Sequence, residues 1–491
     1  MSLLIAIDQS TSATKAILFD SQATALDSVS LEHQQHYPQP GWVEHDAEEI
    51  WQNLLKSTSQ LCSRNRDKLH EVRGVSITNQ RETFVVFERC TGSPLASAVV
   101  WQCRRGDAIC EELRQAGHEA HVAEKTGLRI DSYFSGSKIL WLMRERPDIA
   151  EAAARGDACV STIDAYLVHR LTGGSVFATD PTNASRTLLY DIAKRDWDAD
   201  LCDLFDVPPC ALPEVRDNTS MFGETDLAGA LPASVPICGI MGDSQASLFA
   251  QRCYSPGDAK ATFGSGTSVL LNIGDLQMPN CGAVAALAWV VDGKPTYAWE
   301  GLINYSAATI AWLQNQLGLF DSPDEAEQLA RKVDSSGGVY LVPAFAGLSA
   351  PYWQPNARAA IVGMTAYTGR EHLARAALES IALQVRDVVE MLAMSGVRPT
   401  SLCVDGGPTR NRLLMQMVAD IAEVKLISAS SPNFSALGAA MAGMLGLGMA
   451  ESMNSLSELP RDVTLFEPQM KSERLGNLVD GWHSAVRRVL Q

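Results

Sequence analysis

The sequence lacks the features that mark membrane, secreted and repetitive proteins. No stretch of the chain approaches the ~18–20 apolar residues that a transmembrane helix needs. The N-terminus has neither the basic region nor the small-residue cleavage site of a signal peptide. No low-complexity segment or short-period repeat occurs, which excludes solenoid folds. We therefore expect a globular cytoplasmic protein without a membrane span.

Paired metal-binding cysteines are also missing. The eleven cysteines are scattered, and neither Cys-x-x-Cys nor a Cys/His ligand spacing occurs. Cys103 and Cys110 are the nearest pair. An odd number of dispersed cysteines is typical of core thiols in a reducing compartment, so we expect neither disulfides nor a zinc site.

Positive charge is scarce relative to negative charge. The chain has 40 Lys and Arg against 57 Asp and Glu, and its formal net charge is −17. Nucleic acids and anionic membranes both require basic surfaces, so neither is an expected partner. Anionic ligands remain possible, because backbone N–H groups and a few basic side chains can hold them locally.

The chain is too long for one ordinary hydrophobic core. Its 491 residues, 46% of them hydrophobic, predict a globular protein with two large domains. Strand and helix signals alternate, which indicates an α/β fold. One example is the amphipathic segment 46–62, where Asp46 stands as the expected N-cap of a helix.

Two hairpin-like segments, one in each half, enclose polar turns. At 3-LLIAIDQSTSATKAILFDS-21, two apolar runs surround an unusually dense set of hydroxyl and charged side chains. A weaker echo follows at 260-KATFGSGTSVLLNIG-274, and a third, glycine-containing turn at 405–411 leads into a helix pattern. An isolated turn of this kind would be taken for a solvated loop. Two polar turns between strands, one in each half, suggest two similar domains that face one cleft.

These turns have the composition that phosphoryl transfer requires. Donors must hold phosphate oxygens, and a carboxylate must hold Mg²⁺ directly or through water. Asp8 ends a buried strand, and Lys15 and the hydroxyls of Thr11 and Ser12 follow it. The turn 264–268 is small enough for its backbone to approach a phosphate closely. Neither the Walker A pattern nor the dinucleotide G-x-G-x-x-G pattern is present.

Polar and aromatic residues at strand ends could bind an acceptor. Arg81 and Glu82 directly follow a predicted strand, although a surface ion pair is the simpler interpretation. Trp101 follows an apolar strand and could equally be a core residue, while Tyr133 precedes a helix pattern. Asp243 ends a strand near the middle of the chain, where a general base between two domains would be expected.

Many separated blocks of the chain resemble the FGGY family of carbohydrate kinases, and among them the members that phosphorylate glycerol. The blocks occur in the family's order: DQSTSATKAILFD, YPQPGWVEHD, ITNQRET, VVWQCRR, DSYFSGSK, TDPTNASRT, GDSQASLFAQ, VPAFAGLSAPYW and VDGGPTRN. The stretches 133–141 and 359–379 are similar to the two family signatures. The resemblance implies two actin-like (RNase H-like) α/β domains with mixed sheets flanked by helices, and a cleft between them. It assigns residues 1–247 to an N-terminal domain on the acceptor and magnesium side, and 248–491 to a C-terminal domain on the nucleotide side.

The resemblance also implies a reaction and its residues. ATP with Mg²⁺ would phosphorylate a terminal hydroxyl of a small polyol, glycerol or a close relative, and the protein is expected to form a dimer or tetramer. Asp243 would be the catalytic base and would share the metal with Asp8. The expected acceptor-binding residues are Arg81, Glu82, Trp101, Tyr133, Asp243 and Ser244. The expected ATP-binding residues are Thr11, Ser12, Lys15, Ser265, Gly407 and Asn411.

Five positions depart from the pattern of the glycerol-phosphorylating members. Ser10 replaces a glycine, Ser244 a glutamine and Ser268 an aromatic residue, and on the nucleotide side Ala307 and Ala311 replace glycine and glutamine. The smaller side chains at Ser244 and Ser268 should make the acceptor pocket larger and more polar. Losing an apolar contact of phenylalanine size costs roughly 1.5–3 kcal/mol, so weaker glycerol binding is expected. The larger pocket would also suit a larger polyol or a ketose, such as erythritol or a pentulose.

Two further functions remain open on the residues alone. The segment 242-GDS-244 could contain the nucleophile of a serine esterase, although no histidine stands in a recognisable partner motif. A sensor that binds polyol and nucleotide without turnover is the other alternative. Such a protein would have no need to retain Asp8, Lys15 and Asp243 together.

Overall fold

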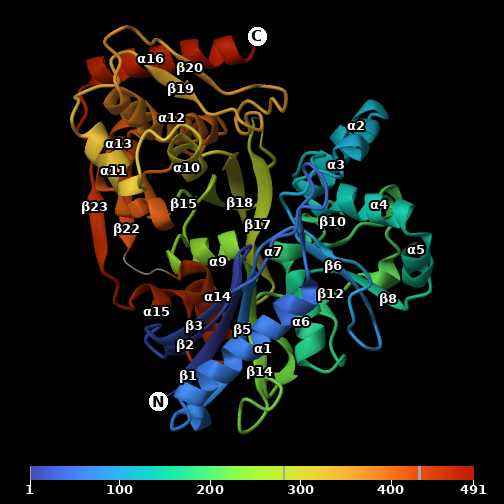
Figure 1. Cartoon of the computed structure of the whole chain (residues 1–491). Helices are drawn as coiled ribbons and strands as arrows, with labels where there is room; N and C mark the ends of the chain where they lie inside the picture. The colour runs from blue at the N-terminus through green and yellow to red at the C-terminus, as the bar shows by residue number, and fades with distance from the viewer. Residues whose placement is uncertain (1, 280–281, 430–432) are drawn as a thin grey trace.

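The fold is built on two large mixed β-sheets (Figure 1). It is described here from a computed structural model that covers residues 2–279, 282–429 and 433–491. The first sheet has the strand order β13 (Met221–Thr225), β14 (Val235–Gly242), β5 (Val72–Asn79), β1 (Leu3–Gln9), β2 (Ala13–Asp20) and β3 (Ala25–Glu32). The second has the order β17 (Val284–Val291), β18 (Lys294–Ile303), β16 (Thr267–Gly274), β15 (Ala259–Phe263), β21 (Ser401–Asp405), β22 (Lys425–Ala429) and β23 (Val463–Phe466).

The two sheets repeat one pattern of strand directions. In the first, an antiparallel hairpin (β1 and β2) is followed by two strands parallel to β1, namely β5 and β14. In the second, the hairpin of β15 and β16 is followed by the parallel strands β21 and β22. Both predicted hairpins are thus present at equivalent places. The prediction of a two-domain α/β fold with mixed sheets is confirmed.

Strand β1 is buried on both faces because helices cover both sides of the first sheet. Leu3 and Ile5 face the core beneath α1 (Ala47–Arg64), whereas Leu4 and Ala6 pack with α14 (Phe434–Gly446). Asp46 is the N-cap of α1, as predicted, and accepts hydrogen bonds from the N–H groups of its first turn. Side chains alternate between faces along a strand, so a nearly continuous apolar run is needed here.

Helices α9 (Asp243–Ala250) and α14 lie between the two sheets, near the centre of the molecule (Figure 1). Small residues permit their close contact: a Cβ at Gly438 would lie 1.8 Å from the carbonyl oxygen of Ala246. The alanine- and glycine-rich α14 therefore packs in a core, although it comes from the second half of the chain. The proposed boundary after residue 247 falls inside α9, which is continuous across it.

The remaining elements surround these sheets. The long helix α12 (Arg370–Met394) packs with α13 (Arg412–Ala422) and α16 (Ser472–Val489) in the core of the second sheet. A smaller sheet has the order β4 (Glu44–His45), β7 (Ala98–Val99), β6 (Phe84–Glu88) and β8 (Ala158–Thr162). Three two-stranded sheets pair β9 (Ala178–Thr179) with β12 (Glu214–Val215), β10 (Tyr190–Asp191) with β11 (Asp196–Trp197), and β19 (Tyr340–Val342) with β20 (Ala360–Val362). The other helices are α2 (Asp107–Gln115), α3 (Glu119–Thr126), α4 (Ser135–Glu145), α5 (Pro147–Ala154), α6 (Ile163–Leu171), α7 (Pro181–Ala184), α8 (Ala199–Leu204), α10 (Ala307–Asn315), α11 (Pro323–Ala330) and α15 (Met453–Ser457), with 3-10 turns η1 (Leu69–Glu71), η2 (Pro209–Ala211) and η3 (Gly407–Arg410).

No helix of the described residues is long and apolar enough to cross a membrane. The ten cysteines that the structure describes are all free thiols. Residue 281, the remaining cysteine, lies outside the described residues.

Candidate active site

The first polar turn joins β1 to β2 and presents one carboxylate beside one amine. Asp8 and Lys15 are paired across the hairpin, and the Nζ of Lys15 lies 3.8 Å from Oδ2 of Asp8. Burial raises the pKa of Asp8 by more than Lys15 lowers it. The hydroxyl of Ser10 bonds to the backbone of Ala13 within the turn, at 3.0 Å to its carbonyl oxygen. The serine that departs from the family pattern is thus used to close the turn.

The second and third turns lie against each other at the edge of the second sheet. Gly406 has φ +97°, and a Cβ there would lie 1.9 Å from the carbonyl oxygen of Phe263, so only glycine fits. The carbonyls of Gly264 and Ser265 accept hydrogen bonds from the first N–H groups of α10, at Ala307 and Ala308. These contacts fix the second turn at the start of α10 and use the first N–H groups of that helix.

Asp243 opens α9 at the junction of the two halves and faces Arg81. Its Oδ1 lies 3.5 Å from Nε of Arg81, and its side chain is 38% exposed. Desolvation raises the pKa of Asp243, and the nearby carboxylate of Asp8 raises it further, while Arg81 and Lys260 lower it. A partly exposed carboxylate with an elevated pKa beside a fixed cation is well suited to accept a proton.

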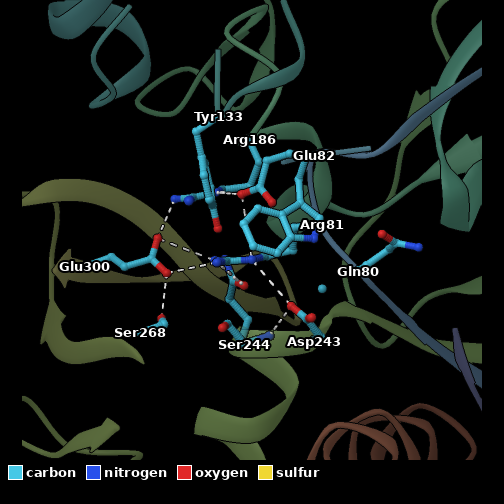
Figure 2. A network of polar contacts seen from close by, with 12 residues as sticks. Gln80, Arg81, Glu82, Tyr133, Arg186, Asp243, Ser244, Ser268 and Glu300 are labelled. Carbon is cyan, nitrogen blue, oxygen red and sulfur yellow. Dashed lines mark hydrogen bonds and ion pairs between the residues drawn. The ribbon is translucent and has the colours of Figure 1, made fainter. Parts of the chain in front are cut away.

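Glu300 from β18 joins two buried arginines of the first half (Figure 2). Its Oε1 lies 2.9 Å from Nη2 of Arg81, and its Oε2 lies 2.7 Å from Nη1 of Arg186. Ser268 donates a further hydrogen bond of 2.8 Å to Oε1. Burial alone would raise the pKa of Glu300, but Arg186 and Arg81 hold it at about 2. The carboxylate is therefore ionised and links the second sheet to the acceptor side.

Glu82 adopts an unusual backbone conformation next to this network. Its φ is +61°, which is rare for a residue with a side chain and is often found at functional sites. The hydroxyl of Ser135 donates to its carbonyl oxygen at 2.7 Å, and Nε of Arg186 donates to its Oε1 at 2.6 Å. The surface ion pair considered for Arg81 and Glu82 is wrong, because both side chains are almost fully buried.

The two aromatic residues of the acceptor side contact each other. The rings of Trp101 and Tyr133 are 5.4 Å apart, and both side chains are partly exposed. The buried ammonium of Lys138 donates to the carbonyl oxygens of Trp101 and Tyr133, at 3.4 and 3.0 Å. Trp101 Nε1 also donates to Oγ1 of Thr11 at 3.0 Å. The aromatic pair is thus tied to the first polar turn.

The TDPTNASRT block connects the ends of β14 and β5. Asp180 accepts from the hydroxyl and N–H of Thr182, whose hydroxyl in turn accepts from the N–H of Gly242. Asn183 exchanges hydrogen bonds with Asn79 at the end of β5. This segment therefore holds together the ends of β14 and β5, where Asp243 and Arg81 follow.

The structure brings together most of the predicted site residues. Asp8, Thr11, Lys15, Arg81, Glu82, Trp101, Tyr133, Asp243 and Ser244 are linked by these contacts or act on one another electrostatically. Ser12, Ser265 and Gly407 are exposed, and among the described residues the hydroxyls of Ser12 and Ser265 make no hydrogen bond with the residues predicted to bind the acceptor. The side chain of Asn411 caps α13 by accepting from the N–H of Leu414 at 2.8 Å. The roles of all these residues stay predictions.

Sequence reasoning assigned no role to Arg186, Glu300 and Lys260. All three are fully buried charged residues. The signal was present: Glu300 and Lys260 interrupt apolar strands, where a charge needs a specific reason, and Arg186 is the last charged residue of the TDPTNASRT block.

The pair of Asp8 and Asp243 has the composition of a magnesium site. No cluster of three or more His, Cys, Asp or Glu that could hold a metal occurs among the described residues. Mg²⁺, however, usually binds one or two carboxylates together with water and substrate phosphates. The buried Asp8, whose nearest cation is 3.8 Å away, can accommodate such an ion.

Comparison with known proteins identifies the family. The N-terminal domain of the FGGY family of carbohydrate kinases matches residues 3–250, and its C-terminal domain matches residues 260–447. The chain belongs to the FGGY family of carbohydrate kinases. Glycerol kinase 1 of Thermotoga maritima is 44% identical over 494 residues, with 99% of each chain covered, and the glycerol kinase of Carboxydothermus hydrogenoformans is 45% identical, with 99% of this chain and 97% of the relative covered.

Solved structures of FGGY kinases have the same fold. The structure of Plasmodium falciparum glycerol kinase with ADP superposes with a TM-score of 0.93 at 35% sequence identity. The match covers 100% of this chain and 99% of that chain. A xylulose kinase of Lactobacillus acidophilus has a TM-score of 0.91 at 20% identity, and the match covers 100% of this chain and 99% of that chain. At this identity the likeness shows a shared fold and no more. The predicted kinase class is confirmed. Within the described residues no histidine hydrogen-bonds to Ser244, so an esterase triad is not formed there.

Proposed function

We propose that this FGGY kinase transfers the γ-phosphoryl group of ATP to a terminal hydroxyl of a small polyol, glycerol or a close relative. The observation that carries the proposal is Asp243, a partly exposed carboxylate 3.5 Å from Arg81, at the N-terminus of α9 between the two sheets. The full-length relatives are named as glycerol kinases, and one solved relative is described with ADP.

Asp243 would take the proton of the attacked hydroxyl. The acceptor oxygen then forms a bond to the γ-phosphorus, and the bond from that phosphorus to the β–γ bridging oxygen breaks, so ADP leaves with the electron pair. Arg81 holds the Asp243 carboxylate, while Glu82, Trp101 and Tyr133 surround the acceptor. The helix N-terminus at α9 favours the negative charge at this point.

The polar turns would hold the nucleotide. Thr11, Ser12 and Lys15 would bind the phosphates from the first half and Ser265 from the second. Gly407 and Asn411 would lie beside the adenosine; Gly407 is exposed, and a Cβ there would meet no atom within 4 Å. Asp8 and Asp243 would hold Mg²⁺, which supplies positive charge to the phosphate oxygens when bound.

A second candidate acceptor is a larger polyol or a ketose. Ser268 is partly exposed, and its hydroxyl donates to Glu300, so the proposed acceptor site would have a small polar wall at this point. A four-carbon polyol or a pentulose could use the space that a bulkier side chain would fill.

A screen of acceptors tests the proposal. ADP release is measured in a coupled assay with Mg-ATP and glycerol, erythritol, threitol, dihydroxyacetone or a pentulose. We expect acceptor-dependent ADP release with glycerol or erythritol. Release that is equally fast without any acceptor, or absent with all of them, would contradict a polyol kinase and favour the sensor.

A further inference from the structure

Lys260 is a buried cation of the second sheet that the proposed mechanism does not use. It lies on β15, the strand that leads into the second polar turn, and its exposed fraction is 0%. Ala259 and Ala261 flank it in the strand, so its surroundings along the chain are apolar. A lysine at such a position is costly unless its charge is compensated.

Two hydroxyls hold the amine of Lys260. Its Nζ donates to Oγ1 of Thr262 at 2.7 Å and to Oγ of Ser244 at 3.3 Å. Among the residues that the structure describes, no carboxylate oxygen lies within 4 Å of this nitrogen. Burial lowers the pKa of Lys260, and Arg81 lowers it further, while Asp405, Glu300 and Asp243 raise it only from longer range.

An apolar side chain of similar volume would avoid this cost. Replacement of buried charges by well-packed apolar residues is often neutral or stabilising, so stability alone does not explain Lys260. Its amine contacts Ser244, the residue next to Asp243, and this contact points to a role in the reaction.

The bond from Lys260 determines how Ser244 can bond in turn. A serine hydroxyl has two acceptor lone pairs and a single proton to donate. The ammonium occupies the acceptor side, so the proton of Ser244 must point elsewhere. In the described structure this hydroxyl donates to no protein atom, and Ser244 is partly exposed beside Asp243.

We propose that Lys260 is a positioning residue for phosphoryl transfer: it orients the hydroxyl of Ser244 as a hydrogen-bond donor to the acceptor. The inference rests on the proposed function, since it takes the acceptor to lie beside Asp243. Lys260 acts from the second sheet and Ser244 from the start of α9. The donor is therefore correctly oriented only when these two elements are packed together.

A double-mutant cycle tests this role. Lys260→Met, Ser244→Ala and the double variant are compared with wild type for kcat and for the KM of acceptor and ATP. We expect each single change to lower kcat/KM for the acceptor about tenfold, the value of one charge-assisted hydrogen bond. The KM for ATP should stay within about twofold of wild type, and the double variant should lose no more than the larger single loss.

The controls separate this role from a structural one. Lys125→Met removes a lysine of α3 that pairs with Asp198, the N-cap of α8, and should leave all constants unchanged. Thr262→Val removes one of the two hydroxyls that hold the amine of Lys260 and leaves the amine in place. This variant replaces Lys260→Met in the test if Lys260→Met does not fold. It should lower acceptor kcat/KM in the wild type but not in the Ser244→Ala background.

The outcomes distinguish the two proposals. Additive losses from Lys260→Met and Ser244→Ala, or an unchanged acceptor kcat/KM in Lys260→Met, would overturn the positioning role. A wild-type protein without acceptor-dependent ADP release would overturn the proposed function instead.

Discussion

The indole nitrogen of Trp101 donates a 3.0 Å hydrogen bond to the hydroxyl of Thr11. One residue belongs to the predicted acceptor side and the other to the turn predicted to hold phosphate. Because Thr11 accepts this bond, its own proton is left to donate, as a phosphate oxygen would require. The bond therefore links the two predicted substrate sites.

Replacing Trp101 by phenylalanine tests this link. Phenylalanine keeps an aromatic ring against Tyr133 but removes the donor. We expect kcat/KM for ATP to fall about three- to tenfold, the cost of one ordinary hydrogen bond. Steady-state kinetics at saturating acceptor gives this value. Trp197→Phe is the control: it removes an indole hydrogen bond to the carbonyl oxygen of Pro213 and should leave kcat/KM for ATP unchanged. An effect on acceptor KM alone would contradict the link.

Asp243→Asn should abolish transfer while leaving nucleotide binding nearly intact. The amide cannot accept the proton of the attacked hydroxyl, and positioned general bases contribute about 10²–10⁴-fold to rates. Coupled ADP release measures the loss, and calorimetric titration with ADP checks binding. Residual turnover above about a tenth of wild type would remove Asp243 from the role of base.

Glu300→Gln should destabilise the protein at neutral pH. The change leaves the buried charges of Arg81 and Arg186 without their shared counter-charge. Breaking a buried ion pair on one side costs about 3–5 kcal/mol. Urea unfolding at pH 7 measures the free energy. A variant as stable as wild type would mean that Glu300 is not needed to compensate the two arginines.

The same carboxylate predicts a loss of stability in acid. The folded-state pKa of Glu300 is about 2, against 4.5 in the unfolded chain, so its ionised form stabilises the fold. This contribution of about 3 kcal/mol is present above pH 4.5 and is lost as the pH falls toward 2. Wild type should therefore lose more free energy of unfolding across this range than Glu300→Gln. Parallel pH dependences would contradict the assignment.

Gly406→Ala should displace the third polar turn from the second. The new Cβ would lie 1.9 Å from the carbonyl oxygen of Phe263, so the backbone must move. Displacement of about 1 Å in a binding turn can cost about a hundredfold, and we expect the KM for ATP to rise at least tenfold. Gly396 has a similar φ of +105°, but a Cβ there would lie within 4 Å of no other atom. Gly396→Ala therefore measures the cost of placing a side chain at a positive φ without a steric clash. Equal effects of both changes on ATP KM would refute the steric explanation.

Ser268→Phe should shift the acceptor preference toward glycerol. A ring at this position fills the space beside Glu300, and burying a phenylalanine is worth roughly 1.5–3 kcal/mol. The ratio of kcat/KM for erythritol to that for glycerol should fall about tenfold. Ser268→Ala removes the bond to Glu300 without filling the space and should leave the ratio near wild type. A ratio unaffected by Ser268→Phe would show that the acceptor does not reach this wall.

The sequence alone determined the fold class and most of the candidate site. The two hairpins follow from short-range patterns, namely apolar runs of strand length around polar turns. The pairing of Asp8 with Lys15 across the first hairpin is a finding of the structure. Arg81 and Asp243 were also found, because each closely follows a recognisable strand: the β-branched residues of β5 precede Arg81, and the apolar β14 precedes Asp243. Such signals depend on neighbours along the chain.

Only the tertiary structure decided how the charges are compensated. Glu300 lies more than a hundred residues from either Arg81 or Arg186, and no local pattern predicts which buried acid meets which arginine. The same holds for Lys260 and Ser244, and for α14, which comes from the second half of the chain but packs on the first sheet. A buried charge must find a partner because desolvation is costly, yet the packing of distant elements selects that partner.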